Sequence, residues 1–310
     1  MRVVVVGLGV QGRKRRDIAG VDCIATVDVE NTSADFSDIK SVPLESFDAA
    51  LCCIPDSPKF EIIRYLLENK KHVLVEKPLW TTTDLKIEEL QKIALNNSVI
   101  CYTAYNHRFE PHYVSAKKII ESGKLGKIYH CRVFYGNGTA RQVRDSAWRD
   151  HGSGVLHDLG SHMLDTAIYW FGSLNEDLKI YSSRRFENLS PDHVVFGGST
   201  KNGVQMEIEV TLLSWRNHFT CDIYAENGSL HIESLCKWGP TRFIHRTRVL
   251  PSGRPIEVVD DLEQADPTWL NEYDYFKKLV SSGTTNLTTD VWINKVLRTL
   301  GEEAIRMASL

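Results

Sequence analysis

The start of the chain places a glycine-rich turn directly after a β-branched run, and this arrangement constrains the fold more than any other feature. Met1 to Gly7 predicts a buried strand that ends in glycine, and the next residues complete the pattern G-x-G-x-x-G over 7–12. Gly7 permits a tight turn, Gly9 lets the backbone approach a pyrophosphate, and Gly12 lets the following helix pack close to the sheet. The amino end of that helix offers free N–H groups to phosphates. The pattern therefore predicts a dinucleotide site whose backbone contacts are Gly7, Gly9, Val10, Gln11 and Gly12.

An acidic residue ends the second predicted strand, Asp22–Asp28. Asp28 stands about 20 residues after the glycine turn, where a carboxylate binds the ribose hydroxyls of a dinucleotide. A carboxylate there would repel a 2′-phosphate, which favours NAD over NADP. Asp28 could instead be a turn-forming acid. Arg13 and Arg16 could reach a 2′-phosphate, but we interpret the basic run Arg13–Arg16 as the solvated face of the first helix.

Strands and amphipathic helices alternate through the first third of the chain. Strands are expected over Asp48–Ile54, Lys71–Val75 and Val99–Tyr105, with helices over Pro58–Lys70 and Asp84–Leu95. The connection after Asp28 is too short for a full helix and strand, so we expect only a small helix or turn near Asp35–Ile39. This alternation predicts a parallel, doubly wound Rossmann sheet over residues 1–106.

A lysine followed by proline stands at the carboxyl end of the strand Lys71–Val75, in the sequence Glu76-Lys77-Pro78. Ligands of open α/β sheets collect at the carboxyl ends of strands. A lysine partly withdrawn from water at such a place loses its proton more readily, so it can exchange protons near neutral pH. Lys77 is therefore a candidate catalytic residue.

A second polar group follows at Asp158-Leu159-Gly160-Ser161-His162, near the expected start of a helix that runs to about Phe171. Asp158, His162, Asp165 and Tyr169 would lie on one stripe of that helix. An acid and an imidazole on an otherwise apolar helix are costly to bury without a purpose. Two alternatives are a surface Asp–His pair and a metal site that includes His157. No third ligand has compelling spacing, so no metal is expected.

Taken together, these motifs resemble the family of glucose–fructose oxidoreductase and inositol 2-dehydrogenase, called Gfo/Idh/MocA. The matching segments are residues 7–12, Asp28, Ile54-Pro55, 72–78, 105–111, 146–149 and 152–165. One departure is Lys59, which stands where many members have histidine after the third strand.

The resemblance implies hydride transfer between nicotinamide and a carbinol or keto carbon of a sugar, cyclitol or nucleotide-sugar. It implies that Ile54, Pro55, Glu76 and Lys77 contact the cofactor. It also implies that Lys77 and His162 act as acid and base while Asp158 orients His162 or the substrate. The implied substrate contacts are Asn106, His107, Trp148 and Arg149. A cis Lys77–Pro78 bond is a further expectation.

The remainder of the chain reads as strands in succession, with an Asn-Gly hairpin signal at Glu226–Ser229 and closing helices over Pro267–Ser281 and Thr289–Met307. We expect an α+β substrate-binding and oligomerisation domain over residues 107–310 with an open, mainly antiparallel sheet, its last helices able to pack back on the first domain. By resemblance, we expect a homodimer or homotetramer.

Bulk composition excludes several classes of partner. The 310 residues suffice for two domains, and 37 basic against 40 acidic residues argue against a nucleic-acid or anionic membrane surface. No apolar stretch reaches the roughly 18 residues that span a bilayer. Seven cysteines without Cys-x-x-Cys predict reduced thiols and a cytoplasmic protein. The alternative to a dehydrogenase is a non-catalytic dinucleotide-binding sensor or regulatory protein. A third hypothesis is an enzyme that retains its cofactor.

Overall fold

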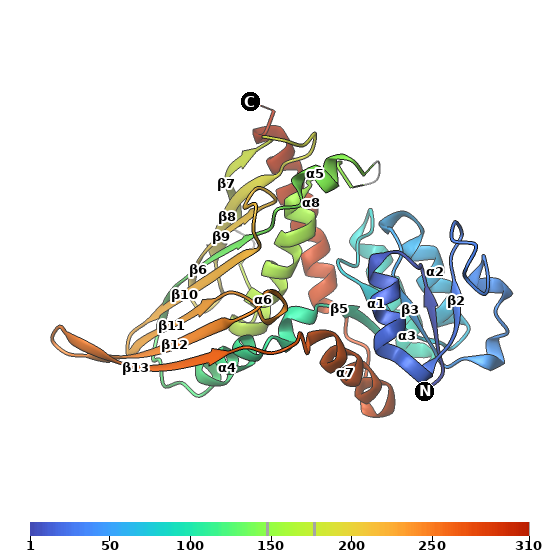
Figure 1. Ribbon diagram of the computed structural model, residues 1–310, viewed down its shortest axis with the longest axis horizontal. Helices are drawn as coiled ribbons and strands as arrows, with labels where there is room; N and C mark the ends of the chain where they lie inside the picture. Colours follow the sequence, from blue (N-terminus) through green and yellow to red (C-terminus); the bar gives the residue numbers. More distant parts are fainter. Residues whose placement is uncertain (147–148, 176–177, 310) are drawn as a thin grey trace. The chain divides into compact units, whose positions relative to one another are not determined.

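The computed structural model describes residues 1–146, 149–175 and 178–309, and the chain divides into two compact units (Figure 1). The first unit comprises Met1–Asn106 and Thr268–Lys295, and the second comprises His107–Pro267 and Val296–Leu310. A segment from the end of the chain therefore belongs to the same unit as the glycine turn.

The first unit is built on a five-stranded sheet in which every neighbouring pair is parallel. The strand order is β2-β1-β3-β4-β5. The strands are β1 (Val3–Val6), β2 (Cys23–Val27), β3 (Ala49–Cys52), β4 (His72–Glu76) and β5 (Cys101–Ala104). This confirms the predicted parallel sheet.

Helices cover both faces of this sheet because alternate strand residues point to opposite sides. Val4 and Val6 share a core with Ile63 of α2 (Asp56–Glu68) and Leu90 of α3 (Asp84–Asn96). On the other side, Val3 and Val5 share a second core with apolar residues of α1 (Val10–Ala19) and α7 (Thr268–Ser282). The sheet is therefore doubly covered, and α7 supplies part of the second layer.

The connection between β2 and β3 is shortened, as predicted. Its described residues hold two single 3₁₀ turns, Ile39–Ser41 and Leu44–Ser46, and no α-helix. The Asp35 carboxylate accepts hydrogen bonds from the amide and hydroxyl of Thr26, which ties the loop to β2. The connection therefore pairs with β2 at Phe36 and then packs Ile39, Val42 and Phe47 into the core without a crossover helix.

The second unit is built on an eight-stranded sheet in the order β13-β12-β11-β10-β6-β9-β8-β7. Only the pair β6–β9 is parallel, so the sheet is mainly antiparallel, as predicted. Its strands are β6 (Ile128–Gly136), β7 (Lys179–Arg184), β8 (His193–Ser199), β9 (Gln205–Thr211), β10 (His218–Ala225), β11 (Gly228–Glu233), β12 (Thr241–Val249) and β13 (Gly253–Leu262). The predicted Asn-Gly hairpin joins β10 to β11, where Ala225 pairs with Gly228.

Three helices lie on one face of this sheet (Figure 1): α4 (Pro111–Glu121), α6 (Ser161–Phe171) and the later part of α8 (Thr288–Met307). The short helix α5 (Ala140–Arg144) follows β6. Strand residues that face α4 and α6, such as Val133 and Ile223, are buried. The opposite face carries more exposed side chains, including Tyr224. None of the described helices is long and apolar enough to cross a membrane.

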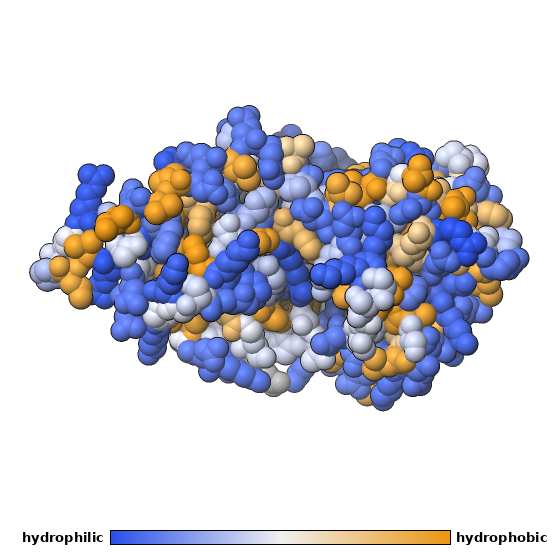
Figure 2. Space-filling view, turned by 90° about the horizontal axis from the view of Figure 1, so that it is seen from below, coloured by the Kyte–Doolittle hydropathy of each residue, from blue (hydrophilic) through white to orange (hydrophobic). Residues whose placement is uncertain are grey.

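The hairpin of β12 and β13 extends from the sheet edge and exposes apolar side chains, visible at the left of Figure 2. Leu250, Ile256 and Val258 are 70%, 64% and 63% exposed. These two strands were not among the predicted elements, because their polar and apolar residues do not follow a half-buried alternation.

Candidate active site

The glycine turn is sterically closed at two glycines and open at the third. A Cβ on Gly12 would lie 1.7 Å from the Gly7 carbonyl oxygen, and a Cβ on Gly7 would lie 2.3 Å from the Cys53 carbonyl oxygen. Gly7 also has a φ of 90°, which favours glycine. A Cβ on Gly9 would meet no heavy atom within 4 Å. Contacts within the protein therefore require glycine at positions 7 and 12, whereas the space above Gly9 is available to a ligand.

Asp28 is tied to the glycine turn by its own carboxylate. It accepts the Leu8 amide at 2.6 Å and the Glu30 and Asn31 amides at 2.9 and 2.8 Å. Partial burial opposes the charge, but these amides and nearby Arg13 outweigh it and lower the pKa of Asp28. The turn-forming alternative is thus visible in the structure. A carboxylate has about four acceptor positions, so the contacts leave capacity for a ribose hydroxyl.

The basic run after the turn does not form one solvated face. Arg16 pairs with Asp17 at 3.3 Å and is exposed, as expected. The Arg15 side chain is only 1% exposed and binds Glu76 and Glu272. The interpretation as a solvated face was therefore wrong for Arg15. Two carboxylates from distant parts of the sequence pair with its guanidinium and compensate for its burial.

Strand β4 ends at Glu76 and is followed at once by Lys77, whose bond to Pro78 is cis, as predicted. Lys77 is partly buried. Ile54 and Pro55 follow the neighbouring strand β3, so they stand at the same carboxyl edge of the sheet. This edge of the first unit carries all of the predicted cofactor contacts.

In the second unit, the structure brings together two histidines that the sequence separates by 55 positions. His162 lies in the first turn of α6, and its ring stacks on that of His107 with centroids 4.0 Å apart and planes 16° apart. The side chains of His107 and His162 are 1% and 7% exposed. Two predicted site residues thus form one buried pair.

Two further residues join this pair, and sequence reasoning missed both. The Lys237 ammonium lies 3.3 Å from His107 Nε2 and donates to the Tyr135 hydroxyl at 3.2 Å. It also lies 4.7 Å from the Trp238 ring centre. Burial opposes the charge of Lys237, but Tyr135 and the carboxylates of Glu110 and Asp266 outweigh it and raise its pKa. We name His107, His162, Tyr135 and Lys237 the histidine cluster.

Asp158 does not lie on one regular α-helical stripe with His162. Residues Leu156–Gly160 form a π-helical turn directly before α6, so the assumed spacing of 3.6 residues fails there. Asp158 is 41% exposed, and its carboxylate lies 3.7 Å from Arg149 Nη2. The structure therefore brings Asp158 together with Arg149, another predicted site residue.

The other members of the predicted stripe and of the substrate contacts are placed as follows. Asp165 is buried and accepts two hydrogen bonds from Arg108, at 2.8 and 2.5 Å. Burial raises the pKa of Asp165 despite this arginine. Asn106 donates to the Thr268 hydroxyl at 2.9 Å within the first unit. Trp148 lies outside the described residues.

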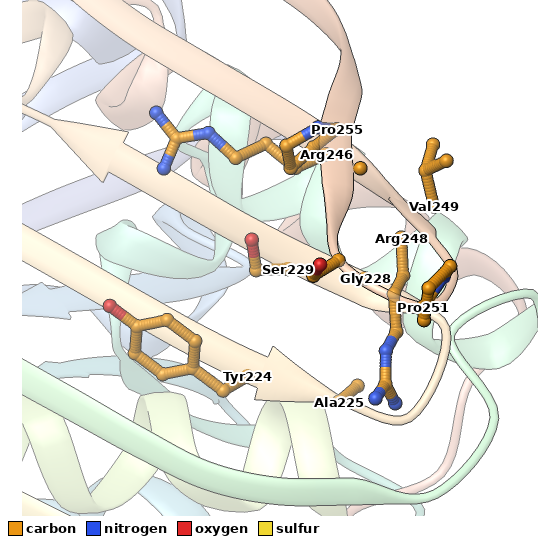
Figure 3. Close-up of a pocket in the computed structure, with 11 residues that line it drawn as sticks. Tyr224, Ala225, Gly228, Ser229, Arg246, Arg248, Val249, Pro251 and Pro255 are labelled. Atoms are coloured by element: carbon orange, nitrogen blue, oxygen red, sulfur yellow. The ribbon is translucent and has the colours of Figure 1, made fainter.

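A pocket of about 280 Å³ lies elsewhere in the second unit, beside the β12–β13 turn (Figure 3). Tyr224, Ser229, Arg246 and Arg248 line it, and none of the predicted site residues does. Arg246 is already bound to Glu257 at 2.8 Å. The pocket opens between short loops on the sheet edge, far along the sequence from the motifs of the first half.

The glycine turn, the acid after β2 and the doubly covered parallel sheet define a nicotinamide-dinucleotide-binding class of α/β protein. Two family models match this chain: the oxidoreductase family with an NAD-binding Rossmann fold over residues 1–105, and the C-terminal domain of the same family over residues 113–231. The chain belongs to the Gfo/Idh/MocA family, and it is an NAD-binding oxidoreductase.

Individual relatives agree with this assignment. The chain is 25% identical over 271 residues to the scyllo-inositol 2-dehydrogenase (NAD(+)) of Bacillus subtilis, a match covering 85% of this chain and 75% of that protein. It is 30% identical over 131 residues to an uncharacterized oxidoreductase of Schizosaccharomyces pombe, which covers 41% of this chain and only 35% of that protein's length.

Solved structures share the whole fold at low identity. A levoglucosan dehydrogenase in complex with NADH matches with a TM-score of 0.84 at 18% identity, over 99% of this chain and 98% of that one. An NAD binding oxidoreductase from Klebsiella pneumoniae matches with a TM-score of 0.81 at 16% identity, over 99% and 96%. At these identities the likeness concerns the fold.

Proposed function

We propose that this protein is an NAD-dependent dehydrogenase that transfers hydride between nicotinamide and a carbinol or keto carbon of a sugar, cyclitol or nucleotide-sugar. The observation that carries the proposal is the histidine cluster, in which an imidazole pair, a phenol and an ammonium are gathered in one buried group. Such groups donate and accept hydrogen bonds to hydroxyls, as a polyol requires. Two relatives are named for scyllo-inositol and levoglucosan.

The first unit would hold the cofactor. Its candidate contacts are Gly7, Gly9, Val10, Gln11, Gly12, Asp28, Ile54, Pro55, Glu76 and Lys77, all at or beside the carboxyl edge of the parallel sheet. The amino end of α1 would face the phosphates, with the open space above Gly9 admitting the pyrophosphate. When bound, NAD supplies the hydride acceptor, and the protein supplies placement and proton handling.

Lys77 and His162 are the proposed acid and base. When a hydroxyl-bearing carbon gives up hydride, the hydroxyl must lose its proton, and reduction requires the reverse. Each unit offers one group able to carry that proton. Asp158 and Arg149, paired at 3.7 Å, together with Asn106, His107 and Trp148, are the proposed substrate contacts.

A substrate scan tests the proposal. Purified protein would be mixed with NAD or NADP and with sugars, inositols and nucleotide-sugars in turn, while nicotinamide absorbance is followed. We expect at least one polyol to be oxidised, with NAD preferred. Folded protein that binds NAD but turns over no member of the panel would instead favour the sensor hypothesis. Release of NAD only on denaturation would reveal a retained cofactor.

We further propose that the chain self-associates as a homodimer or homotetramer and works in the cytoplasm. The exposed apolar residues of β13, an edge strand, support association because such edges pair readily with other strands. Light scattering on the purified protein would test it, and a monomer at all concentrations would contradict it.

A further inference from the structure

Lys77 stands between two residues that buried cations hold in place. Glu76 precedes it and binds Arg15, while Pro78 follows it and binds Lys59. Arg15 comes from α1 and Lys59 from α2, so the two cations come from helices on opposite faces of the sheet. All of these residues belong to the first unit.

The contacts of Arg15 account for its burial. Its Nε donates to Glu76 Oε1 at 2.7 Å, and its Nη2 donates to Glu272 Oε2 at 2.6 Å. The Trp269 ring lies against the guanidinium with its centre 4.2 Å away. Arg15 therefore joins the helix that begins at the glycine turn to the end of β4 and to α7.

Lys59 holds the other side of Lys77. Its side chain is 3% exposed, and its Nζ donates to the Pro78 carbonyl at 2.8 Å and to Asp56 Oδ1 at 2.7 Å. The carbonyl of Pro78 is a backbone group, so this bond fixes the course of the chain directly after Lys77. This lysine is the residue that departs from the family pattern after the third strand.

Burying Arg15 together with Glu76 and Glu272 is expensive, and well-packed apolar residues of similar size would often be as stable. Stability alone therefore explains these cations poorly. A requirement for position explains them better, because a displacement of about 1 Å at a reacting group can cost roughly 100-fold in rate.

We propose that Arg15 and Lys59 are positioning residues that fix Lys77 from both sides, and that Arg15 aligns Lys77 with the cofactor by linking β4 to the helix of the glycine turn. The proposal rests on the proposed function, in which Lys77 carries the substrate proton. Neither residue touches the reacting atoms; both act through the backbone and side chain that flank Lys77.

Two substitutions, two matched controls and one conservative variant test this. Arg15→Met and Lys59→Met should each lower kcat by about 10- to 100-fold. The Kd for NAD should change much less than kcat, since neither residue is itself a proposed cofactor contact, although Arg15 binds Glu76, which is one. Arg16→Met on α1 and Arg64→Met on α2 are matched controls, being 48% and 42% exposed, and should retain full activity. Lys59→Arg should recover part of the lost rate, because it keeps the charge.

A double-mutant comparison separates positioning from a merely structural role. In a Lys77→Met background, adding Lys59→Met or Arg15→Met should change the residual rate by less than about twofold, because the effect runs through Lys77. A full additional loss in that background would overturn the proposal.

A second readout does not require turnover. Acetylation of Lys77 by limiting acetic anhydride, followed across pH by mass spectrometry with exposed Lys92 as the internal reference, reports the reactivity of Lys77 in the whole protein. We expect the profile to shift in Arg15→Met and Lys59→Met and to stay unchanged in the two controls. Identical profiles in wild type and both variants would overturn the proposal.

If the Met variants do not fold, Arg15→Lys and Lys59→Arg carry the same comparison. If the protein turns over no substrate but the acetylation profile of Lys77 shifts in both variants, the proposed function is refuted while the positioning of Lys77 by Arg15 and Lys59 is supported.

Discussion

The imidazole rings of His107 and His162 stack 4.0 Å apart, and Lys237 lies 3.3 Å from Nε2 of the first ring. His107 follows the last strand of the parallel sheet, and His162 begins α6, so no local pattern links them. The contact explains why a histidine in an apolar helix is tolerated, since its ring packs flat against another. It also means that His162 has a fixed orientation.

Replacement of His162 by asparagine should lower kcat by roughly 10²- to 10⁴-fold, because one of the two proposed acid–base groups is lost. The Kd for NAD should stay the same, since the proposed cofactor contacts all belong to the first unit. Steady-state rates and isothermal titration with NAD would measure the two quantities. His157→Asn is the control and should keep most of the activity, because His157 lies five residues before His162 in the π-helical turn and its side chain is partly exposed. Equal losses in both variants would argue against a specific role.

Replacement of Asp165 by alanine should destabilise the protein by about 3–5 kcal/mol, because it removes one partner of a buried ion pair and leaves Arg108 poorly compensated. Asp165 is 1% exposed. Asp145→Ala breaks the pair with Arg144 on the surface, where Asp145 is 72% exposed, and should cost less than about 1 kcal/mol. Urea unfolding measures both changes. A small loss for Asp165→Ala would contradict the importance of the pair.

Glu272 should make stability fall as pH rises. Burial, aided by the nearby Glu76 charge and opposed by Arg15, raises its pKa from 4.5 to about 7. Between these values the folded protein holds a proton that the unfolded chain has lost, so the contribution of Glu272 to stability is greatest at low pH and is lost by neutral pH. A pKa difference of this size corresponds to about 3 kcal/mol of unfolding free energy.

The measurement compares urea unfolding of wild type and Glu272→Gln from about pH 5 to pH 8. Other titrating groups are common to both proteins, so the difference isolates Glu272. We expect wild type to lose stability relative to Glu272→Gln as pH rises. Parallel curves for the two proteins would show that Glu272 is ionised throughout.

Substitutions in the glycine turn should distinguish an effect on folding from an effect on NAD binding. Gly9→Ala should leave the melting temperature nearly unchanged, because its Cβ meets no heavy atom within 4 Å, yet raise the Kd for NAD by on the order of tenfold or more. Gly12→Ala should lower the melting temperature as well, because its Cβ would lie 1.7 Å from the Gly7 carbonyl oxygen. Thermal melts and NAD titration test both. Unimpaired NAD binding by Gly9→Ala would place the pyrophosphate elsewhere.

Local patterns predicted the fold well because its signals are local. The β-branched run before Gly7 and the alternation of strands and helices follow from neighbouring residues, as does the Asn-Gly hairpin between β10 and β11. The sequence did not reveal β12 and β13, because the exposed residues of a hairpin arm carry no period that marks a buried face.

The sequence predicted candidate site residues only where they belong to a local motif. Lys237 and Tyr135 were not predicted as site residues, because no sequence pattern joins a 3₁₀ turn to a strand 102 positions earlier. Arg15 pairs with Glu272, which lies 257 positions away in the sequence. Because no local pattern shows this partner, the basic run was interpreted as a solvated face. A Lys-Trp pair directly after the apolar Leu235-Cys236 was the available hint of a cation held near an aromatic ring.

In the proposed function, Lys77 carries the substrate proton during hydride transfer. The most direct test is a single-turnover measurement of nicotinamide absorbance with wild type and Lys77→Met, using a polyol found in the substrate scan and saturating NAD. We predict that Lys77→Met still binds NAD, with a Kd that changes far less than the rate does, but transfers hydride at least about 100-fold more slowly. Hydride transfer at the wild-type rate in Lys77→Met would contradict the account.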